Sequence, residues 1–487
     1  MAVCAAAVLL FGSYILLYKL GNEPFQDYDE ATYAEVTHES IEQGNPSRLT
    51  FLYLPYFRKP PLLFWMTTAS AQVFKDVEFA DRFPSALAGL AAAVIVALIC
   101  IEAGAGVWTG LFAAAILATT AGWMEFARDV RFDTLVALFD VAAFYAALRA
   151  SRDSRWFWMV GITLALAVLS KSVIALFGGI AVLAVLVYER KFIGAFRDRN
   201  FWLGIGVFVL VAAPWHIYMT LTYGGAFWHS YVGMEVFDRA AANLFPGGGN
   251  PTNTQYLEYL RENAAPWWQL FVLLVLSAPL LLRRLPQRIR SAFEASIVAV
   301  LAVFAVAFGA KTKAFGYLIP LFPFLAVAVA LAGWALWQWG KKKGREHADT
   351  IRAVLIAVTI VLIAYAAALT RYEALHLDPY YIWELSQAYE EYDVGEIIRS
   401  APEPTVYTYG GYDFLGSIYY YSGIPDTPNP YILLWSASST PAATSTNFIL
   451  ATSSLESLSK AFPRYRFTQD YSGRFVSLFT VVPAAAR

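Results

Sequence analysis

The sequence predicts a polytopic α-helical membrane protein with a small α/β domain at its carboxyl end. Of its 487 residues, 58% are hydrophobic and 15% are charged, and the mean hydropathy is +0.49. A soluble domain carries about 25% charged residues, so this chain has more apolar side chains than one water-exposed core can bury. The apolar residues are grouped in stretches of about 20 residues, the length that crosses a bilayer as a helix.

Eleven apolar stretches are the predicted spans, and a count of 11 to 13 is compatible with the pattern. The first looks like a secretory signal, but it lacks a basic leader and further spans follow, so we expect it to remain as an uncleaved anchor. The approximate bounds are 2–20, 80–101, 106–123, 133–149, 156–170, 172–188, 201–222, 267–282, 293–310, 315–339 and 351–369.

Basic residues in short loops predict the orientation, because such loops tend to face the cytoplasm. The connectors 149–155, 189–200, 283–292 and 340–352 hold 16 Lys and Arg in 42 residues. The loops 21–79 and 223–266 and the tail then lie on the outer face of the cytoplasmic (inner) membrane. We expect residues 1–370 to form the transmembrane domain, with its site in those two loops.

The tail, residues 371–487, is expected to form a soluble α/β domain on the same outer face. Its β-rich runs alternate with helix-like segments. The β-rich runs are TVYTYG, NFILATS and RFVSLFTVV, and the helix-like segments are LSQAYEEYDVGEIIRS and SLESLSKAF.

Several function classes are disfavoured by composition and by missing motifs. The net charge of −1 argues against a nucleic-acid partner, and the two cysteines argue against a disulfide framework or a cysteine-based metal site. The sequence has no Walker loop, no Rossmann fingerprint and no HExxH motif. Nucleotide-driven pumping is therefore not expected.

The outer loop 21–79 contains the first candidate site residues. The segment QDYDEATYAEVTHESIEQGN predicts a helix from Asp29 to Gln43. Asp29 and Glu30 then start this helix where a lipid head group would lie, and a carboxylate there can act as a base. An ordinary explanation stays open, since Asp29 can be a helix N-cap and Glu30 can interact with the helix dipole.

Two basic motifs come next. In PYFRKPPLLFW, Arg58 and Lys59 precede two prolines, which hold them on a rigid turn. In EFARDVRFD, Arg131 precedes a predicted span and Asp133 is its first residue. Charges at such positions usually line a polar cavity, because a charge at mid-bilayer costs about 2.5–3.5 kcal/mol. Phosphate binding explains the basic residues, but interfacial snorkelling and simple ion pairing explain them as well.

Further polar residues complete the candidate set. Lys171 separates two apolar helices with almost no loop around it, which is an unfavourable position for a cation unless an anion binds there. His216 lies within a span, where we expect a local hydrogen bond. The remaining candidates are the cations Arg239, Lys311 and Lys313 and the cavity residues Tyr33 and Tyr56.

Together these residues suit one kind of reaction. A sugar joined through phosphate to an isoprenoid needs the bilayer for its tail, cations for the departing phosphate, and a carboxylate to deprotonate the acceptor hydroxyl. The expected catalytic carboxylates are Asp29, Glu30 and Asp133. The expected phosphate ligands are Arg58, Lys59, Arg131, Arg239, Lys311 and Lys313.

Seven motifs in sequence order resemble the GT-C-fold membrane glycosyltransferases, in the bacterial branch of the aminoarabinose transferases and relatives of the protein O-mannosyltransferases. The motifs are DEATYAE, PYFRKPPLLFW, ADRFPSALAGL, RFDTL, LSKSV, PWHIY and KTKAFGYLIPLFP, and they cover most of residues 20–330. The resemblance implies inverting transfer from a polyprenyl-phosphate sugar to a lipid, glycan or protein hydroxyl in an outer-face cavity. It also implies that Asp29 is the base, that Asp133 is a second cavity carboxylate, and that Lys59 and Arg239 contact the donor phosphate.

The chain departs from the family pattern at three positions. Thr32 replaces a usual Arg, Arg58 replaces a common Glu before Lys-Pro-Pro, and Val236 replaces the His that often follows Glu235. Because the resembling aminoarabinose transferases are associated with a metal held by that Glu and His, we expect no metal and no other cofactor here. Arg58 would offer a fixed positive charge instead, and the sugar and the acceptor stay open.

Two other functions use the same residues differently. A transporter or lipid flippase would line a path with these charges, and it predicts matched halves or broken helices, which the sequence does not show. A noncatalytic envelope assembly subunit would bind partners through its outer domain and would tolerate loss of every carboxylate named above.

Overall fold

The computed structural model describes most of the chain in two compact units. The described residues are 2–483, apart from 27–28, 244–249, 283–284, 344–347, 376–378, 403, 410–415, 423–431, 435–445, 452–454 and 474–475. The first unit comprises 1–20, 57–66 and 82–377, and the second comprises 21–56, 67–81 and 378–487. The boundary between the units therefore falls within two helices, α3 and α4, and each unit is described by itself.

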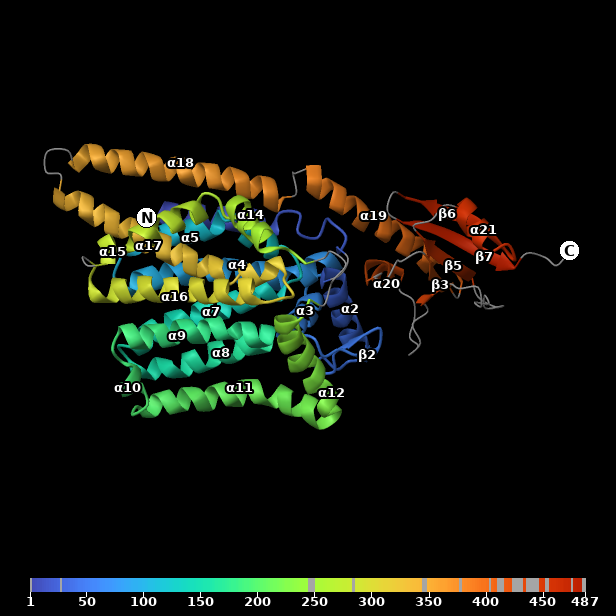
Figure 1. The fold of residues 1–487 in the computed structure, drawn as a ribbon, viewed down its shortest axis with the longest axis horizontal. Helices are drawn as coiled ribbons and strands as arrows, with labels where there is room; N and C mark the ends of the chain where they lie inside the picture. Colours follow the sequence, from blue (N-terminus) through green and yellow to red (C-terminus); the bar gives the residue numbers. More distant parts are fainter. Residues whose placement is uncertain are drawn as a thin grey trace. The chain divides into compact units, whose positions relative to one another are not determined.

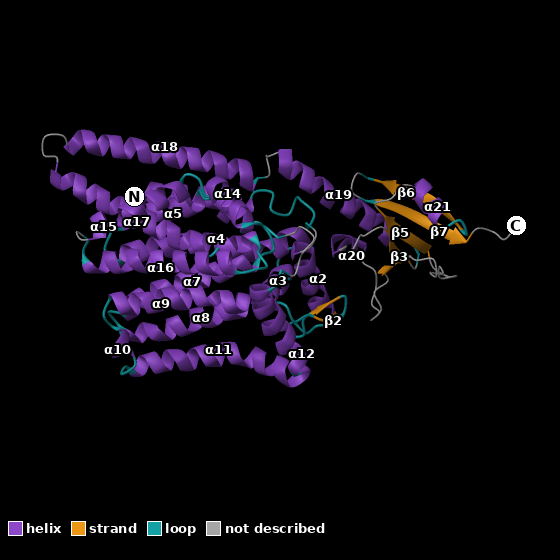
Figure 2. Cartoon of the chain, in the orientation of Figure 1, coloured by secondary structure: helices purple, strands orange, loops and turns teal. Residues whose placement is uncertain are grey.

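The first unit is built from long apolar helices (Figures 1 and 2). In chain order the longer ones are α1 (Ala2–Leu17), α3 (Leu62–Ala71), α4 (Val77–Glu102), α5 (Val107–Ala118), α7 (Phe132–Ala150), α8 (Phe157–Lys171), α9 (Leu176–Tyr188), α11 (Arg199–Tyr223), α15 (Trp267–Leu282), α16 (Gln287–Gly309), α17 (Leu321–Lys343) and α18 (Ala348–Ala374). The other helices, most of them short, connect these: α6 (Ala121–Phe126), η1 (Ser154–Trp156), η2 (Ser172–Ala175), α10 (Phe192–Ala195), α12 (Gly225–Trp228), η3 (His229–Asp238), α13 (Arg239–Ala241), α14 (Asn253–Asn263) and η4 (Phe315–Leu318).

Each of the eleven predicted apolar stretches overlaps a helix of this unit, which confirms the predicted class of fold. The stretch 106–123 is interrupted, since α5 ends at Ala118 and α6 starts at Ala121. By length and composition alone, four helical segments of the described chain are long and apolar enough to cross a membrane, namely Val77–Glu102, Arg199–Tyr223, Gln287–Gly309 and Phe315–Gln338. Shorter apolar helices accompany them. The exact number of crossings therefore stays a prediction.

Close helix packing forms the scaffold of the first unit. α8 packs between α7 and α11, and α16 packs against α9 and α17 (Figure 1). At Gly161 of α8 and Gly204 of α11 the two backbones nearly touch, because a Cβ at Gly161 would lie 2.1 Å from the carbonyl oxygen of Gly204. Only glycine permits this approach, so these positions fix the spacing of the two helices.

The second unit combines N-terminal segments with an α/β module. α2 (Asp29–Glu42) is followed by the short antiparallel strands β1 (Thr50–Phe51) and β2 (Leu54–Pro55). The module contains α19 (Pro379–Ser400), β3 (Pro404–Tyr409), α20 (Gly416–Ser422), β4 (Ile432–Leu434), β5 (Thr446–Ala451), α21 (Leu455–Ala461), β6 (Tyr465–Ser472) and β7 (Ser477–Pro483). Its strand order is β4-β3-β5-β7-β6, with β3 parallel to β4 and β5 and with β7 antiparallel to β5 and β6.

Helices cover both faces of this five-stranded sheet (Figure 2). Alternate strand residues point to opposite faces. On one face, Val406 and Phe448 pack with Val394 of α19 and Ile418 of α20. On the other face, strand side chains pack with Leu458 of α21. The predicted α/β character of the tail is therefore confirmed, and the predicted helix at Asp29–Gln43 corresponds to α2.

Candidate active site

Lys59 lies on a rigid turn immediately before α3, where Pro60 and Pro61 follow it. Its ammonium group donates a hydrogen bond to Glu235 Oε2 at 3.0 Å, and both side chains are only 12% exposed. Arg58 Nε lies 3.7 Å from Glu235 Oε1, but the Arg58 side chain is 55% exposed. The two basic residues of the PYFRKPP motif thus meet the same carboxylate, which is 176 residues away from Lys59 in the sequence.

Glu235 and Arg239 come from one stretch of short helices. Glu235 lies on η3, a π-helix. Such helices are rare in proteins, and where they occur they are often at functional sites. Arg239, the first residue of α13, places Nη2 3.3 Å from Glu235 Oε1. Burial alone would raise the pKa of Glu235, but the charges of Lys59 and Arg239 outweigh burial and lower this pKa. Glu235 therefore stays ionised and holds the three basic side chains in place.

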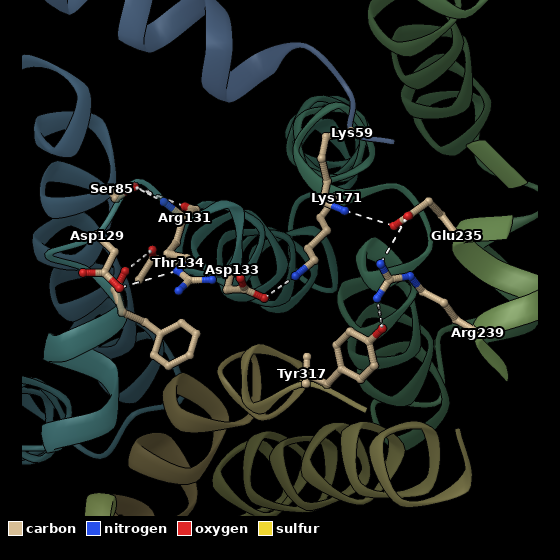
Figure 3. Close-up of polar contacts among 12 residues, drawn as sticks. Lys59, Ser85, Asp129, Arg131, Asp133, Thr134, Lys171, Glu235, Arg239 and Tyr317 are labelled. Atoms are coloured by element: carbon tan, nitrogen blue, oxygen red, sulfur yellow. Dashed lines mark hydrogen bonds and ion pairs between the residues drawn. The ribbon is translucent and has the colours of Figure 1, made fainter. Parts of the chain in front are cut away.

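Tyr317 joins this group from η4. The Arg239 guanidinium donates to the Tyr317 hydroxyl oxygen at 3.4 Å (Figure 3). The backbone before η4 is tied to the same region, since Thr312 N donates to the carbonyl oxygen of Arg239 at 2.8 Å. We call Arg58, Lys59, Glu235, Arg239 and Tyr317 the Glu235 cluster.

A second ion pair lies beside the Glu235 cluster. Asp133, in the first turn of α7, accepts a hydrogen bond from the ammonium group of Lys171, the last residue of α8. Lys171 Nζ is also 5.8 Å from the centroid of the Tyr317 ring. A Cβ at Gly316 would lie 2.8 Å from Asp133 Oδ1, so glycine is required for η4 to approach this carboxylate. Figure 3 shows the Asp133–Lys171 pair beside the Glu235 cluster, to which Tyr317 belongs.

Arg131 contacts an acidic residue, an aromatic ring and the hydroxyl of Ser85. Its Nε is 3.5 Å from Asp129 Oδ2, and its guanidinium lies 5.3 Å from the centroid of the Phe126 ring. Its backbone N–H donates to the hydroxyl of Ser85 at 3.2 Å (Figure 3). The contact with Asp129 corresponds to the simple ion pairing that the sequence left open, and a phosphate-binding role of Arg131 stays a prediction.

Three other candidates of the first unit also have local partners. The ammonium group of Lys313 donates to the carbonyl oxygens of Phe308 and Ala310, at the end of α16. The backbone N–H of Lys311 donates to Ala240 O at 3.2 Å, and its side chain is exposed. His216 hydrogen-bonds to Ala212 O at 2.8 Å and to the Tyr231 hydroxyl at 3.1 Å. Substrate contacts of Lys311, Lys313 and His216 stay predictions.

The remaining candidates belong to the second unit. Asp29 is exposed and is the first residue of α2. Glu30 is buried and accepts a hydrogen bond from Gln26 N at 2.9 Å, which is a capping interaction at the helix start. Tyr33 and Tyr56 are buried as well. A joint role of these four residues with Lys59 stays a prediction.

Sequence reasoning did not assign roles to two residues of the Glu235 cluster. Tyr317 lies inside the quoted motif KTKAFGYLIPLFP, and Glu235 lies in the stretch compared with the family, so both were near the signal. A sequence pattern cannot show that the carboxylate of Glu235 collects basic side chains from a distant loop. The spacing of four residues between Glu235 and Arg239 was the one local sign of this pairing.

Comparisons with known proteins agree with this architecture. Residues 58–218, about a third of the chain, match the family model of dolichyl-phosphate-mannose-protein mannosyltransferases. The chain is 27% identical over 376 residues to an undecaprenyl phosphate-alpha-4-amino-4-deoxy-L-arabinose arabinosyl transferase of Shewanella sediminis, covering 75% of this chain and 66% of the relative. For the protein of the same name from Aeromonas hydrophila the identity is 26%, with coverages of 74% and 65%. The chain thus spans just under two thirds of the length of these relatives.

A solved structure shows the same fold. The crystal structure of ArnT from Cupriavidus metallidurans bound to undecaprenyl phosphate superposes with a TM-score of 0.69 over 98% of this chain and 97% of that one, at 17% sequence identity. These matches confirm the fold class and the resemblance expected from the motifs, and they support the expectation of a glycosyltransferase. The chain has the GT-C fold and resembles the aminoarabinose transferases and, over residues 58–218, the protein O-mannosyltransferases.

Proposed function

We propose that this protein transfers a sugar from a polyprenyl-phosphate donor to a hydroxyl group of a lipid, glycan or protein acceptor. The observation that carries the proposal is the Glu235 cluster, in which three basic side chains within 4 Å of one carboxylate lie next to a tyrosine hydroxyl. Such a cluster is suited to a phosphate group, which accepts charge-assisted hydrogen bonds from Lys and Arg. The name of the relatives, which act on an undecaprenyl phosphate-linked sugar, supports the same donor class.

In the proposed reaction, the acceptor oxygen forms a bond to the anomeric carbon while the bond from that carbon to the phosphate oxygen breaks. The polyprenyl phosphate leaves with the bonding electrons, and a carboxylate takes the acceptor proton. Lys59, Arg239 and the Tyr317 hydroxyl would stabilise the negative charge that develops on the phosphate. The opposite-face attack inverts the anomeric centre.

The carboxylates have different roles in this proposal. Asp29 is the proposed base that deprotonates the acceptor, as the resemblance implies. Asp133 is held by Lys171, so its carboxylate is fixed beside Tyr317. Its proposed role is to shape the electrostatic field of the site, and it does not accept the proton of the acceptor hydroxyl. Glu235 keeps Lys59 and Arg239 together before the donor binds, which is the preorganisation that makes such electrostatic stabilisation effective.

We also propose that no divalent metal is used here. By the resemblance to the aminoarabinose transferases, Arg58 stands where Glu is expected, and Val236 follows Glu235 where His is expected. The donors around Glu235 are ammonium and guanidinium groups, which repel a divalent cation, so the residues present do not fit a metal. Arg58 would instead provide a fixed positive charge on a planar guanidinium, a shape that suits a phosphate group.

For the location, we propose the cytoplasmic membrane with the site and the C-terminal module on the outer face. The distribution of basic residues among the short connectors supports this orientation. The test is to fuse a reporter enzyme after residue 487, using a reporter that is active only outside the cytoplasm. An inactive reporter on a stably inserted protein would contradict the proposed orientation.

The direct test of the activity is a transfer assay. Purified full-length protein is incubated with a panel of radiolabelled polyprenyl-phosphate sugars and a cell-envelope extract, and the label is followed into lipid, glycan and protein fractions. We expect label in one fraction, and we expect Asp29→Asn to abolish it while donor binding remains. Movement of the labelled donor across vesicles without any product would favour a transporter instead. Undiminished turnover of Asp29→Asn would remove Asp29 from the mechanism.

A further inference from the structure

Tyr421 of the C-terminal module contacts two N-terminal segments within the second unit. Its hydroxyl oxygen accepts a hydrogen bond from the backbone N–H of Phe25 at 2.8 Å, and its O–H donates to Glu78 Oε1 at 3.0 Å. Residues 25 and 421 are 396 positions apart in the sequence. Tyr421 is 4% exposed and Phe25 is completely buried, so the bond between them is protected from water.

The position of Tyr421 is set by the C-terminal module itself. Tyr421 lies on α20, whose Ile418 belongs to the core on one face of the sheet. α20 is also fixed to α19, since Ser417 donates a hydrogen bond to Glu391. A Cβ at Gly395 of α19 would lie 2.6 Å from Tyr421 Cβ, so the two helices touch at a glycine and α20 has little freedom to shift.

On its other side, Tyr421 fixes the segment that leads into α2. The Phe25 ring is stacked on the Tyr421 ring at 6.3 Å and meets the Tyr420 ring edge-on at 5.1 Å. The next residue, Gln26, donates its N–H to Glu30 and accepts a hydrogen bond from Ala31 N at 3.0 Å. Asp29 directly precedes the two residues that are hydrogen-bonded to Gln26, so the anchor at Phe25 and Gln26 holds the first turn of α2.

We propose that Tyr421 is a positioning residue for the transfer reaction, and that the C-terminal module acts on catalysis by holding the first turn of α2 through this hydroxyl. The inference rests on the proposed function, in which Asp29 of that turn is the base. Without the hydroxyl, the buried N–H of Phe25 loses an acceptor, and the turn is free to shift until that N–H finds another partner. A base that is displaced by about 1 Å slows a reaction by up to about 100-fold.

The test is Tyr421→Phe in the full-length protein, which removes one oxygen and keeps the ring contacts. We expect kcat to fall about tenfold, with the donor KM, the thermal midpoint and the number of donor-binding sites per chain little changed. The number of sites is the decisive readout, because loss of folded protein lowers it in step with kcat, whereas displacement of the base does not. A parallel loss of sites and rate would reduce Tyr421 to a structural role and overturn the inference.

Two comparison variants separate the possible failures. Tyr392→Phe removes a hydroxyl from a ring that packs edge-on against Tyr421 at 4.7 Å but does not hold Phe25, and we expect wild-type kcat. If Asp29→Asn is inactive while Tyr421→Phe works at the wild-type rate, the inference is wrong and the assignment of Asp29 survives. If Asp29→Asn is fully active, that assignment fails and the inference fails with it.

Discussion

Replacing Lys59 by Met is the sharpest test of the Glu235 cluster. Methionine is similar in length but uncharged, so the change removes the ammonium group that lies 3.0 Å from Glu235 Oε2. Arg239 and Arg58 still neutralise Glu235, so we expect the cluster to persist and the protein to fold. What is lost is one of the charges that a phosphate would meet.

The expected size of the effect follows from the geometry. Two unit charges about 4 Å apart interact by about 4 kcal/mol at an effective dielectric constant of about 20. Lys59 already interacts with Glu235 before a ligand binds, so we count about half of that energy, near 2 kcal/mol, as the loss in phosphate binding. Since about 1.4 kcal/mol is tenfold, the Kd should rise about 30-fold. Lys59→Arg keeps the charge but changes its shape, and we expect a loss of about threefold.

The assay is a titration of the purified full-length protein in detergent with undecaprenyl phosphate, followed by its tryptophan fluorescence. Lys191→Met serves as a charge-removal control, because Lys191 is exposed in the connector after α9 and should leave the Kd unchanged. Thermal midpoints are measured for every variant. A Kd for Lys59→Met within twofold of the wild-type value, on a protein with the wild-type midpoint, would refute the assignment of Lys59 to the phosphate.

Three further predictions use other groups. Tyr317→Phe removes the hydroxyl that accepts from Arg239, and the Kd for undecaprenyl phosphate should rise about threefold to tenfold in the same titration. Dialysis against a chelator should leave transfer unchanged, and a bound divalent ion beside Lys59 would contradict the proposed role of Arg58. Burial raises the pKa of Glu35, and the nearby charges of Glu39 and Glu42 raise it further. The folded state therefore loses stability as the pH rises above about 4.3, the pKa of a glutamate in the unfolded chain. Glu35→Gln should therefore flatten the fall of the thermal midpoint as the pH rises above about 4.3, and an unchanged slope would exclude Glu35 as the cause of that fall.

The helices of the first unit could be predicted because the relevant signal is local. A run of about 20 apolar residues forms a helix in a bilayer whatever its neighbours are, since the backbone has no other way to satisfy its hydrogen bonds. The break between α5 and α6 was missed because Thr119 and Thr120 are tolerated in apolar segments. The hydroxyl of each donates a hydrogen bond to a backbone carbonyl of the preceding turn, so these threonines can be buried in an apolar environment.

The organisation of the second unit could be predicted only in part. The strands of the tail follow from their β-branched and aromatic residues, and the start of α2 follows from Asp29 and Glu30. The burial of α2 does not, because a helix with buried Glu30, Glu35 and Glu39 has no apolar face that a periodicity argument would detect. The grouping of residues 21–56 with the tail depends on contacts such as the one between Phe25 and Tyr421, which no local pattern encodes.

On the proposed function, the Glu235 cluster supplies through side chains the positive charge that a metal would otherwise supply. A metal centre and a guanidinium both supply positive charge to a departing phosphate, but a metal needs anionic or neutral ligands, whereas a guanidinium needs an anion to hold it in place. In this chain Glu235 is that anion, and its pKa is lowered by the same cations that it orients. On the proposed function, Arg58 therefore requires Glu235 to stay ionised. Glu235→Gln should consequently scatter the three basic side chains and weaken phosphate binding, although it removes a negative charge that by simple Coulomb repulsion opposes the phosphate. A tighter Kd for undecaprenyl phosphate in Glu235→Gln would show that Glu235 opposes the ligand instead of organising its site.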